Sequence, residues 1–136
     1  MKKVGIWMDK EKAYIVRLKE TGEKFETLFS NLEFFSLKNG STSRMKSSGA
    51  QQIIHESRYL EREKHQLRTY FSELAFKIKN AEEVVVFGPG DTNEKFRKSL
   101  LKNYRSIAAK VKVVAKADSK TENQIRALVR KYYHAK

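Results

Sequence analysis

The sequence predicts an α/β protein with a mixed sheet and helices packed on it. Three short strand patterns separated by polar turns open the chain, at residues 4–8, 13–18 and 24–29. Two later apolar strand patterns are each followed by a helix pattern. The predicted order is therefore β-β-β-(long loop)-α-β-α-β-α. Right-handed crossovers between the later strands would make the last two strands parallel.

The first three strands are expected to form an antiparallel meander. Asp9–Lys12 is a polar turn between the first two, and Thr21-Gly22 leads into the third. Residues 36–52 then predict a long loop, since they are rich in Ser, Thr and Gly and contain three cations but no acidic residue. Structureless loops of this length inside a domain are uncommon, and they are usually functional or disordered.

A long helix is expected from about Gln52 to Asn80. Its apolar residues fall on one helical face, namely Leu60, Leu67, Phe71, Leu74 and Ile78. In the next strand, predicted within 81–87, the apolar run of residues 84–87 does not alternate with polar residues, which indicates a central strand covered on both faces.

Two capping boxes are expected at the starts of the last two helices. Asp91 with Glu94 would cap a helix that runs to about Asn103, and Ser119 with Glu122 would cap the final one. Residues 111–115 between these helices predict another strand. The buried stripe of the last helix is predicted as Ile125, Leu128, Val129 and Tyr132.

Length and composition indicate one globular domain over residues 1–136, with 40% hydrophobic and 33% charged residues. There is no cysteine, and the three histidines lack the spacing of metal ligands, so we expect no metal and no cofactor. The apolar start is too short for a signal peptide, and no stretch is long enough to span a bilayer. The expected location is the cytoplasm.

The positive charge is unevenly distributed along the chain. Of the net +13, residues 95–136 carry thirteen Lys and Arg against two Asp and Glu, a net of +11. Residues 36–80 carry +5, whereas residues 81–94 carry −4. Such a field attracts polyanions, which favours an RNA partner over a surface that only keeps the protein in solution. A membrane surface is disfavoured, because no predicted helix pairs a basic face with a wide exposed apolar one.

Two stretches resemble the middle domain of eukaryotic and archaeal class-1 peptide-chain release factors and of the Pelota rescue factor, a domain with small stand-alone bacterial relatives. In residues 81–96, an apolar strand ends in Gly88-Pro89-Gly90, and a helix with Lys95 and Phe96 follows. In the basic segment before the long helix, Gly49-Ala50-Gln51 stands where that family carries a Gly-Gly-Gln tip.

The resemblance implies a ribonuclease-H-like fold and a place in the translation apparatus. In that family, the glutamine of the tip promotes ester hydrolysis at the peptidyl-transferase centre. This chain departs from the family at Ala50, which restricts positive-φ backbone conformations. At 136 residues it also has no room for the codon-reading and partner-binding domains. We therefore expect an RNA-binding, ribosome-associated protein of the rescue or hibernation type rather than an enzyme.

The expected partner is ribosomal RNA or transfer RNA within the ribosome. The candidate RNA-binding residues are Lys38, Arg44, Lys46, Gly49, Gln51, Gln52, Arg58, Arg97, Lys98, Lys102 and Arg105. One alternative is peptidyl-tRNA ester hydrolysis, with Gln51 positioning the water. Another is an adaptor that binds a protein partner on the same fold.

Two further motifs have competing interpretations. The Gly88-Pro89-Gly90 turn could hold an anion at a helix start, but a tight turn is favoured, since Asp91 and Glu94 would oppose an anion there. Asp9 stands where ribonuclease H enzymes carry a carboxylate. It is expected to be a turn residue, because two-metal hydrolysis needs a converging carboxylate cluster.

Overall fold

The structure is a computed structural model that describes residues 2–30 and 49–134, with the backbone alone over residues 49–60. The elements, in chain order, are β1 (Lys3–Met8), β2 (Lys12–Lys19), β3 (Gly22–Phe29), α2 (Gly49–Ile78), β4 (Glu83–Gly88), α3 (Thr92–Asn103), α4 (Arg105–Ala108), β5 (Val111–Lys116) and α5 (Glu122–His134). The predicted α/β class and element order are confirmed. The one-turn helix α4 is an addition that the sequence patterns did not indicate.

The five strands form one mixed sheet in the order β3-β2-β1-β4-β5. The first three strands are the antiparallel meander that the sequence predicts. β4 pairs in parallel with both β1 and β5, so the last two strands are parallel as expected. The first strand of the chain thus lies at the centre of the sheet, between the meander and the crossover strands.

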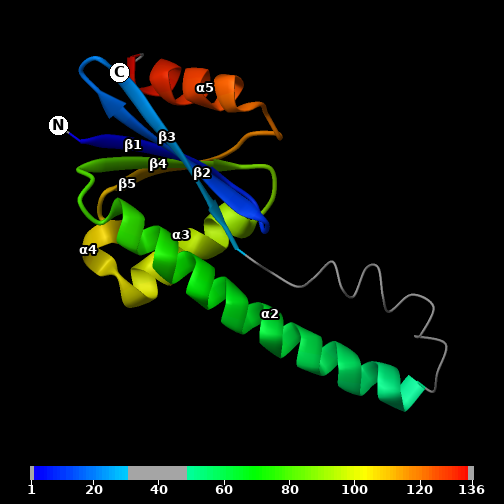
Figure 1. Cartoon of the computed structure of the whole chain (residues 1–136). Helices are drawn as coiled ribbons and strands as arrows, with labels where there is room; N and C mark the ends of the chain where they lie inside the picture. The colour runs from blue at the N-terminus through cyan, green and yellow to red at the C-terminus, as the bar shows by residue number, and fades with distance from the viewer. Residues whose placement is uncertain (1, 31–48, 135–136) are drawn as a thin grey trace.

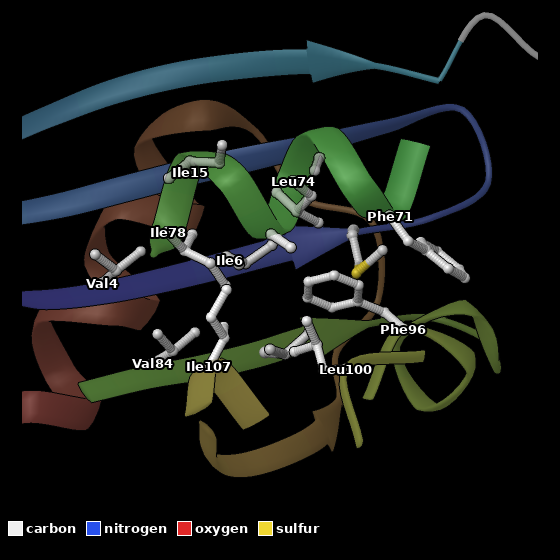
Figure 2. Close-up of a cluster of buried hydrophobic side chains, with 14 of the residues drawn as sticks. Val4, Ile6, Ile15, Phe71, Leu74, Ile78, Val84, Phe96, Leu100 and Ile107 are labelled. Atoms are coloured by element: carbon white, nitrogen blue, oxygen red, sulfur yellow. The ribbon is translucent and has the colours of Figure 1, made fainter. Parts of the chain in front are cut away.

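Helices cover both faces of the sheet, as Figure 1 shows, with α2, α3 and α4 on one side and α5 on the other. The larger core lies under α2 and α3, where Phe71, Leu74 and Phe96 pack toward Ile6 and Ile15 (Figure 2). The smaller core lies under α5 and is built around Trp7, Val16, Val85, Phe87, Ile125, Val129 and Tyr133. The N-terminal part of α2 extends away from the sheet (Figure 1).

β4 contributes side chains to both cores, which accounts for its lack of alternation. Val84 and Val86 belong to the core under α2, whereas Val85 and Phe87 belong to the core under α5. A strand with helices on both faces gains by burying every side chain, so polar positions are not needed. The predicted burial of this strand is confirmed.

The start of α2 differs from the prediction. The helix begins at Gly49 rather than near Gln52, so the predicted loop is too long by its last four residues. The rest of that loop, residues 36–48, lies outside the described residues, as does the side chain of Leu60. Among the other predicted stripe residues, Phe71, Leu74 and Ile78 are buried and Leu67 is partly buried.

Neither helix cap is formed by the predicted residue. The side chain of Asp91 makes no capping hydrogen bond at the start of α3. Instead the buried Asn93 donates from Nδ2 to the carbonyl of Ala115 at 3.1 Å, and its Oδ1 accepts from the backbone N–H of Glu94 at 2.9 Å. The side chain of Asn93, which also reaches β5, therefore takes the place of the local cap expected from Asp91.

The capping box of α5 lies two residues later than predicted. The Thr121 hydroxyl accepts from the backbone N–H of Gln124 at 3.2 Å, and the Gln124 side chain accepts from the Thr121 N–H at 2.9 Å. This is the reciprocal arrangement expected of Ser119 and Glu122. In the same helix Tyr133, rather than Tyr132, is the buried tyrosine, and its hydroxyl donates to the Val4 carbonyl at 2.8 Å.

Candidate RNA-binding surface

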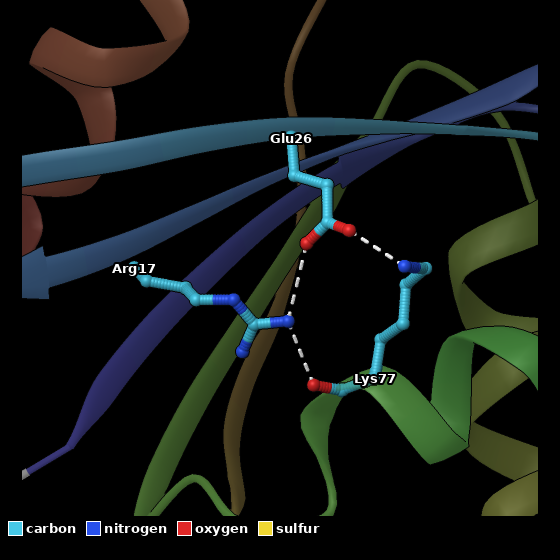
Figure 3. Close-up of polar contacts among 3 residues, drawn as sticks. All are labelled: Arg17, Glu26 and Lys77. Atoms are coloured by element: carbon cyan, nitrogen blue, oxygen red, sulfur yellow. Dashed lines mark hydrogen bonds and ion pairs between the residues drawn. The ribbon is translucent and has the colours of Figure 1, made fainter.

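The C-terminal end of α2 is fastened to the meander by a charged network, shown in Figure 3. Glu26 on the edge strand β3 accepts hydrogen bonds from Lys77 Nζ at 2.5 Å and from Arg17 Nη2 at 3.3 Å. Arg17 also donates to the Lys77 carbonyl at 2.8 Å, which satisfies a backbone group at the end of the helix. The Lys77 hydrogen bond is the main cause that lowers the pKa of Glu26. This network holds α2 in a defined position on the sheet.

A polar groove lies between α2 and the α3–α4 segment, and we call it the α2–α3 groove. It has a volume of about 360 Å³ and is lined by His65, Arg68, Thr69, Ser72, Glu73, Ser99, Asn103 and Tyr104. The hydroxyls of Ser72 and Tyr104 share a 2.9 Å hydrogen bond across it. Its walls offer hydroxyl, amide and guanidinium donors, the groups that contact nucleic-acid phosphates and sugars.

Three of the predicted RNA-binding cations are next in the chain to residues that line this groove. Lys98 and Lys102 are exposed and one turn apart on α3. Lys102 is three residues beyond Ser99 and adjacent to Asn103, both of which line the groove. Arg105 follows at the start of α4, also exposed. Each of these three exposed cations is thus next in the chain to a residue of the groove lining, namely Ser99, Asn103 and Tyr104.

Arg97 belongs to a different face of α3. It precedes the groove-lining Ser99 by two residues, which is a rotation of about 200° around a helix. Its side chain is exposed, on the same side as the exposed Leu101 four residues later. Arg97 is therefore not part of the α2–α3 groove, and its assignment to RNA stays a prediction.

The remaining predicted residues lie before residue 61. Lys38, Arg44 and Lys46 are outside the described residues. The backbones of Gly49, Gln51, Gln52 and Arg58 belong to the N-terminal half of α2, so the Gly-Ala-Gln triplet forms the first turn of a helix rather than the end of a loop. The predicted loop is therefore wrong for residues 49–52, whereas the role of Gln51 stays a prediction.

The Gly88-Pro89-Gly90 turn serves close packing at the carboxyl ends of the parallel strands. A Cβ on Gly88 would lie 2.4 Å from the carbonyl oxygen of Met8, so no larger residue fits there without a backbone shift. The Gly88 carbonyl accepts from the N–H of Ala117 at 2.8 Å. These contacts agree with the interpretation of this segment as a tight turn.

Asp9 is the turn residue that the sequence predicts. Its Oδ1 accepts from the backbone N–H groups of Glu11 at 2.8 Å and Lys12 at 3.0 Å, which closes the β1–β2 turn. Its carbonyl accepts from the hydroxyl of the buried Tyr70 at 3.0 Å, and burial raises the pKa of that phenol. Among the side chains of residues 2–30 and 61–134, no group of three or more acidic, histidine or cysteine residues could hold a metal.

A second groove, which we call the α2–β3 groove, was not predicted. It lies where α2 meets β2 and β3, has a volume of about 860 Å³, and is lined by Arg17, Lys24, Glu26, Ser72, Glu73, Phe76, Lys77, Lys79 and Asn80. Ser72 and Glu73 line both grooves, so the two meet on α2. The available sequence signal was Phe76, a large apolar residue outside the predicted stripe.

The fold of this chain is similar to parts of three solved structures. The chain superposes on Pelota from Archaeoglobus fulgidus with a TM-score of 0.54 at 15% identity, covering 98% of this chain and 36% of that one. For Pelota from Thermoplasma acidophilum the TM-score is 0.55 at 14% identity, with 100% and 32% covered. For the archaeal translation termination factor aRF1 it is 0.51 at 13% identity, with 98% and 38% covered.

The chain therefore has a Pelota/aRF1-like domain fold and spans about a third of the length of these structures. No protein-family model and no curated protein matches its sequence. Across the described ranges, none of the helices is both long enough and apolar enough to cross a membrane.

Proposed function

We propose that this chain is a single-domain RNA-binding protein of the translation apparatus that associates with the ribosome in rescue or hibernation. The observation that carries the proposal is the row of exposed cations beside the polar α2–α3 groove, formed by Lys98, Lys102 and Arg105. These three side chains form no ion pair with an acid among the described residues. The Pelota/aRF1-like fold supports the assignment to translation, because one structure of this fold is a translation termination factor.

The physical basis of binding would be counterion release from the RNA backbone. Each phosphate that a lysine or arginine neutralises frees condensed cations, so affinity falls steeply as salt rises. The hydroxyl and amide groups of Ser99 and Asn103 would hydrogen-bond to phosphate or sugar oxygens, which fixes the position of the strand. Among the described residues of the lining, Glu73 is the one acidic residue, and the positive charge of Arg68 in the same lining offsets its negative charge.

Sucrose-gradient sedimentation of cell lysate tests the proposal. The protein should travel with a ribosomal particle at low salt and stay at the top of the gradient at high salt. A variant with Lys98→Ala, Lys102→Ala and Arg105→Ala should leave the particle at lower salt than the parent. A parent that stays at the top at every salt concentration, and that also fails to bind free RNA, would show the proposal to be wrong.

Peptidyl-tRNA ester hydrolysis with Gln51 is the alternative from the enzyme class. The helical backbone from Gly49 onward places Gln51 at the end of α2 that extends away from the sheet (Figure 1). A group that enters a deep active centre on a larger particle would need such a position. Peptide release from stalled ribosomes by the parent, abolished in Gln51→Ala, is required for this activity. Equal release by both would remove this role from Gln51.

A further inference from the structure

Phe76 is the most exposed of the large hydrophobic residues identified as exposed in the described part of the chain. Its exposed fraction is 66%, although its helical neighbours Leu74 and Ile78 are fully buried. Phe76 lies on a different face of α2 from the apolar stripe and opens onto the α2–β3 groove. Single exposed hydrophobics are common on protein surfaces, so the argument depends on what surrounds this one.

Phe76 shares its groove with several cations. Lys79 Nζ lies 4.0 Å from the ring centroid, a close cation–π contact. The groove lining carries four cations (Arg17, Lys24, Lys77 and Lys79) against two acids, Glu26 and Glu73. Glu26 is hydrogen-bonded to Arg17 and Lys77, and with Glu73 as the second acid the lining keeps a net charge of +2, which favours an external anion.

An exposed aromatic ring among cations matches the chemistry of a single-stranded nucleic acid. Every base has a π-face that stacks on an aromatic side chain, and each nucleotide brings a phosphate that pairs with a nearby cation. The groove volume of about 860 Å³ is large enough to admit a base beside the ring. An acidic peptide without aromatic residues would use the cations but would give the ring no stacking partner.

We infer that Phe76 is a stacking platform for an unpaired RNA base, with Lys24 and Lys79 contacting the adjoining phosphates. This inference rests on the proposed RNA binding and adds a second contact to it. Because Ser72 and Glu73 line both grooves, one strand could follow α2 from the α2–α3 groove, where its backbone is held, to the α2–β3 groove, where a base stacks.

The test uses the full chain and a short, labelled single-stranded RNA, with binding followed by fluorescence anisotropy. Phe76→Ala should weaken binding about thirtyfold, the middle of the range for one base–aromatic stack. Phe76→Trp should bind at least as tightly as the parent, whereas Phe76→Leu should bind as weakly as Phe76→Ala, because leucine is apolar but has no π-face. The matched control is Leu101→Ala, which removes an exposed apolar side chain from α3 and should leave binding unchanged.

A duplex RNA of the same length provides the second readout. Its bases are already stacked and paired, so Phe76→Ala should bind the duplex as the parent does. Urea unfolding of each variant checks that folding is intact, which is expected for an exposed position.

The outcomes separate this inference from the proposed function. If the parent binds no single-stranded RNA, the stacking platform is overturned, and the proposed function fails with it if the parent also stays at the top of the gradient at every salt concentration. If the parent binds RNA and Phe76→Ala binds equally well, RNA binding stands and the stacking platform is overturned. If Phe76→Leu keeps full affinity, or if Phe76→Ala loses ribosome association while RNA affinity is unchanged, the residue makes an apolar contact and stacking is likewise overturned.

Discussion

The ammonium of Lys77 donates a 2.5 Å hydrogen bond to Oε2 of Glu26, and this contact joins the last turn of α2 to the edge strand β3. The two residues are 51 positions apart in the chain, so the contact exists only in the folded protein. It also borders the α2–β3 groove, since both residues line it. The stability of this junction and the shape of the groove are therefore linked.

Replacing Glu26 by Gln should destabilise the fold by about 1 kcal/mol, a size set by partial exposure and solvent screening. The exposed fraction of the Glu26 side chain is 28%. Its pKa is held below the ordinary value of 4.5, first by the Lys77 hydrogen bond, so its contribution is complete above that value and is lost as the pH falls through the lower folded-state pKa. Urea unfolding at a series of pH values should show parent and variant converging in acid. Glu61→Gln, at an exposed acid on α2, is the control, and a difference that persists in acid would contradict this explanation.

Gly5→Ala should destabilise the protein by about 1–3 kcal/mol, the usual cost of overpacking a core. A Cβ at this position would lie 2.4 Å and 2.6 Å from the two methyl groups of Val129, which packs from α5 onto β1. Thermal unfolding should show that Gly5→Ala costs less in a Val129→Ala background, because the smaller residue leaves room. Gly90→Ala is the control, with nothing within 4 Å of its added carbon. Strictly additive effects of the two core changes would show that the predicted clash does not occur.

Thr121→Ala should cost about 1 kcal/mol of stability, the typical worth of an N-cap side chain. The Thr121 hydroxyl accepts from the N–H of Gln124, and this bond is absent in the variant. Ser119→Ala should have little effect, because no capping bond of Ser119 is recorded. Chemical unfolding of the two variants side by side checks this. A larger loss of stability for Ser119→Ala than for Thr121→Ala would show that Ser119 caps the helix, as the sequence pattern indicates.

Lys98→Ala with Lys102→Ala should lower the slope of log affinity against log salt for single-stranded RNA by about 1–2, in line with one phosphate contact for each cation. The charge-matched control is Arg97→Ala with Lys112→Ala, which removes two exposed cations from outside the α2–α3 groove. Its slope should change less. Anisotropy titrations at several salt concentrations measure both, and equal changes would mean that RNA responds to net charge rather than to this groove.

Much of the secondary structure could be predicted from the sequence. The uninterrupted apolar run at 84–87 is a local consequence of burying both faces of a strand, and this strand and the one at 13–18 both formed as predicted. The helical spacing of Phe71, Leu74 and Ile78 marked the buried face of α2 for the same reason. These patterns act through neighbouring residues, so they can be read along the chain.

The caps and the candidate site were less predictable. Asp91 and Ser119 match the local pattern of an N-cap, but Asn93 bonds to a carbonyl of β5, 22 residues away, and Thr121 caps α5 instead. Ser99 and Asn103 carried no sequence signal for a site, because a groove exists only once α2 and α3 pack side by side. The predicted cations did carry a signal, since net charge does not depend on the fold.

By itself, the sequence determined the α/β class, the element order and the concentration of positive charge in its last third, because periodicity and composition are properties of the chain. Only the tertiary structure decided that β1 lies at the centre of the sheet, that Ser99 and Asn103 line a groove with α2, and that Phe76 opens onto a cationic groove. These relationships depend on which faces of distant segments meet. That choice is made by the burial of the two cores as a whole, and no local pattern encodes it.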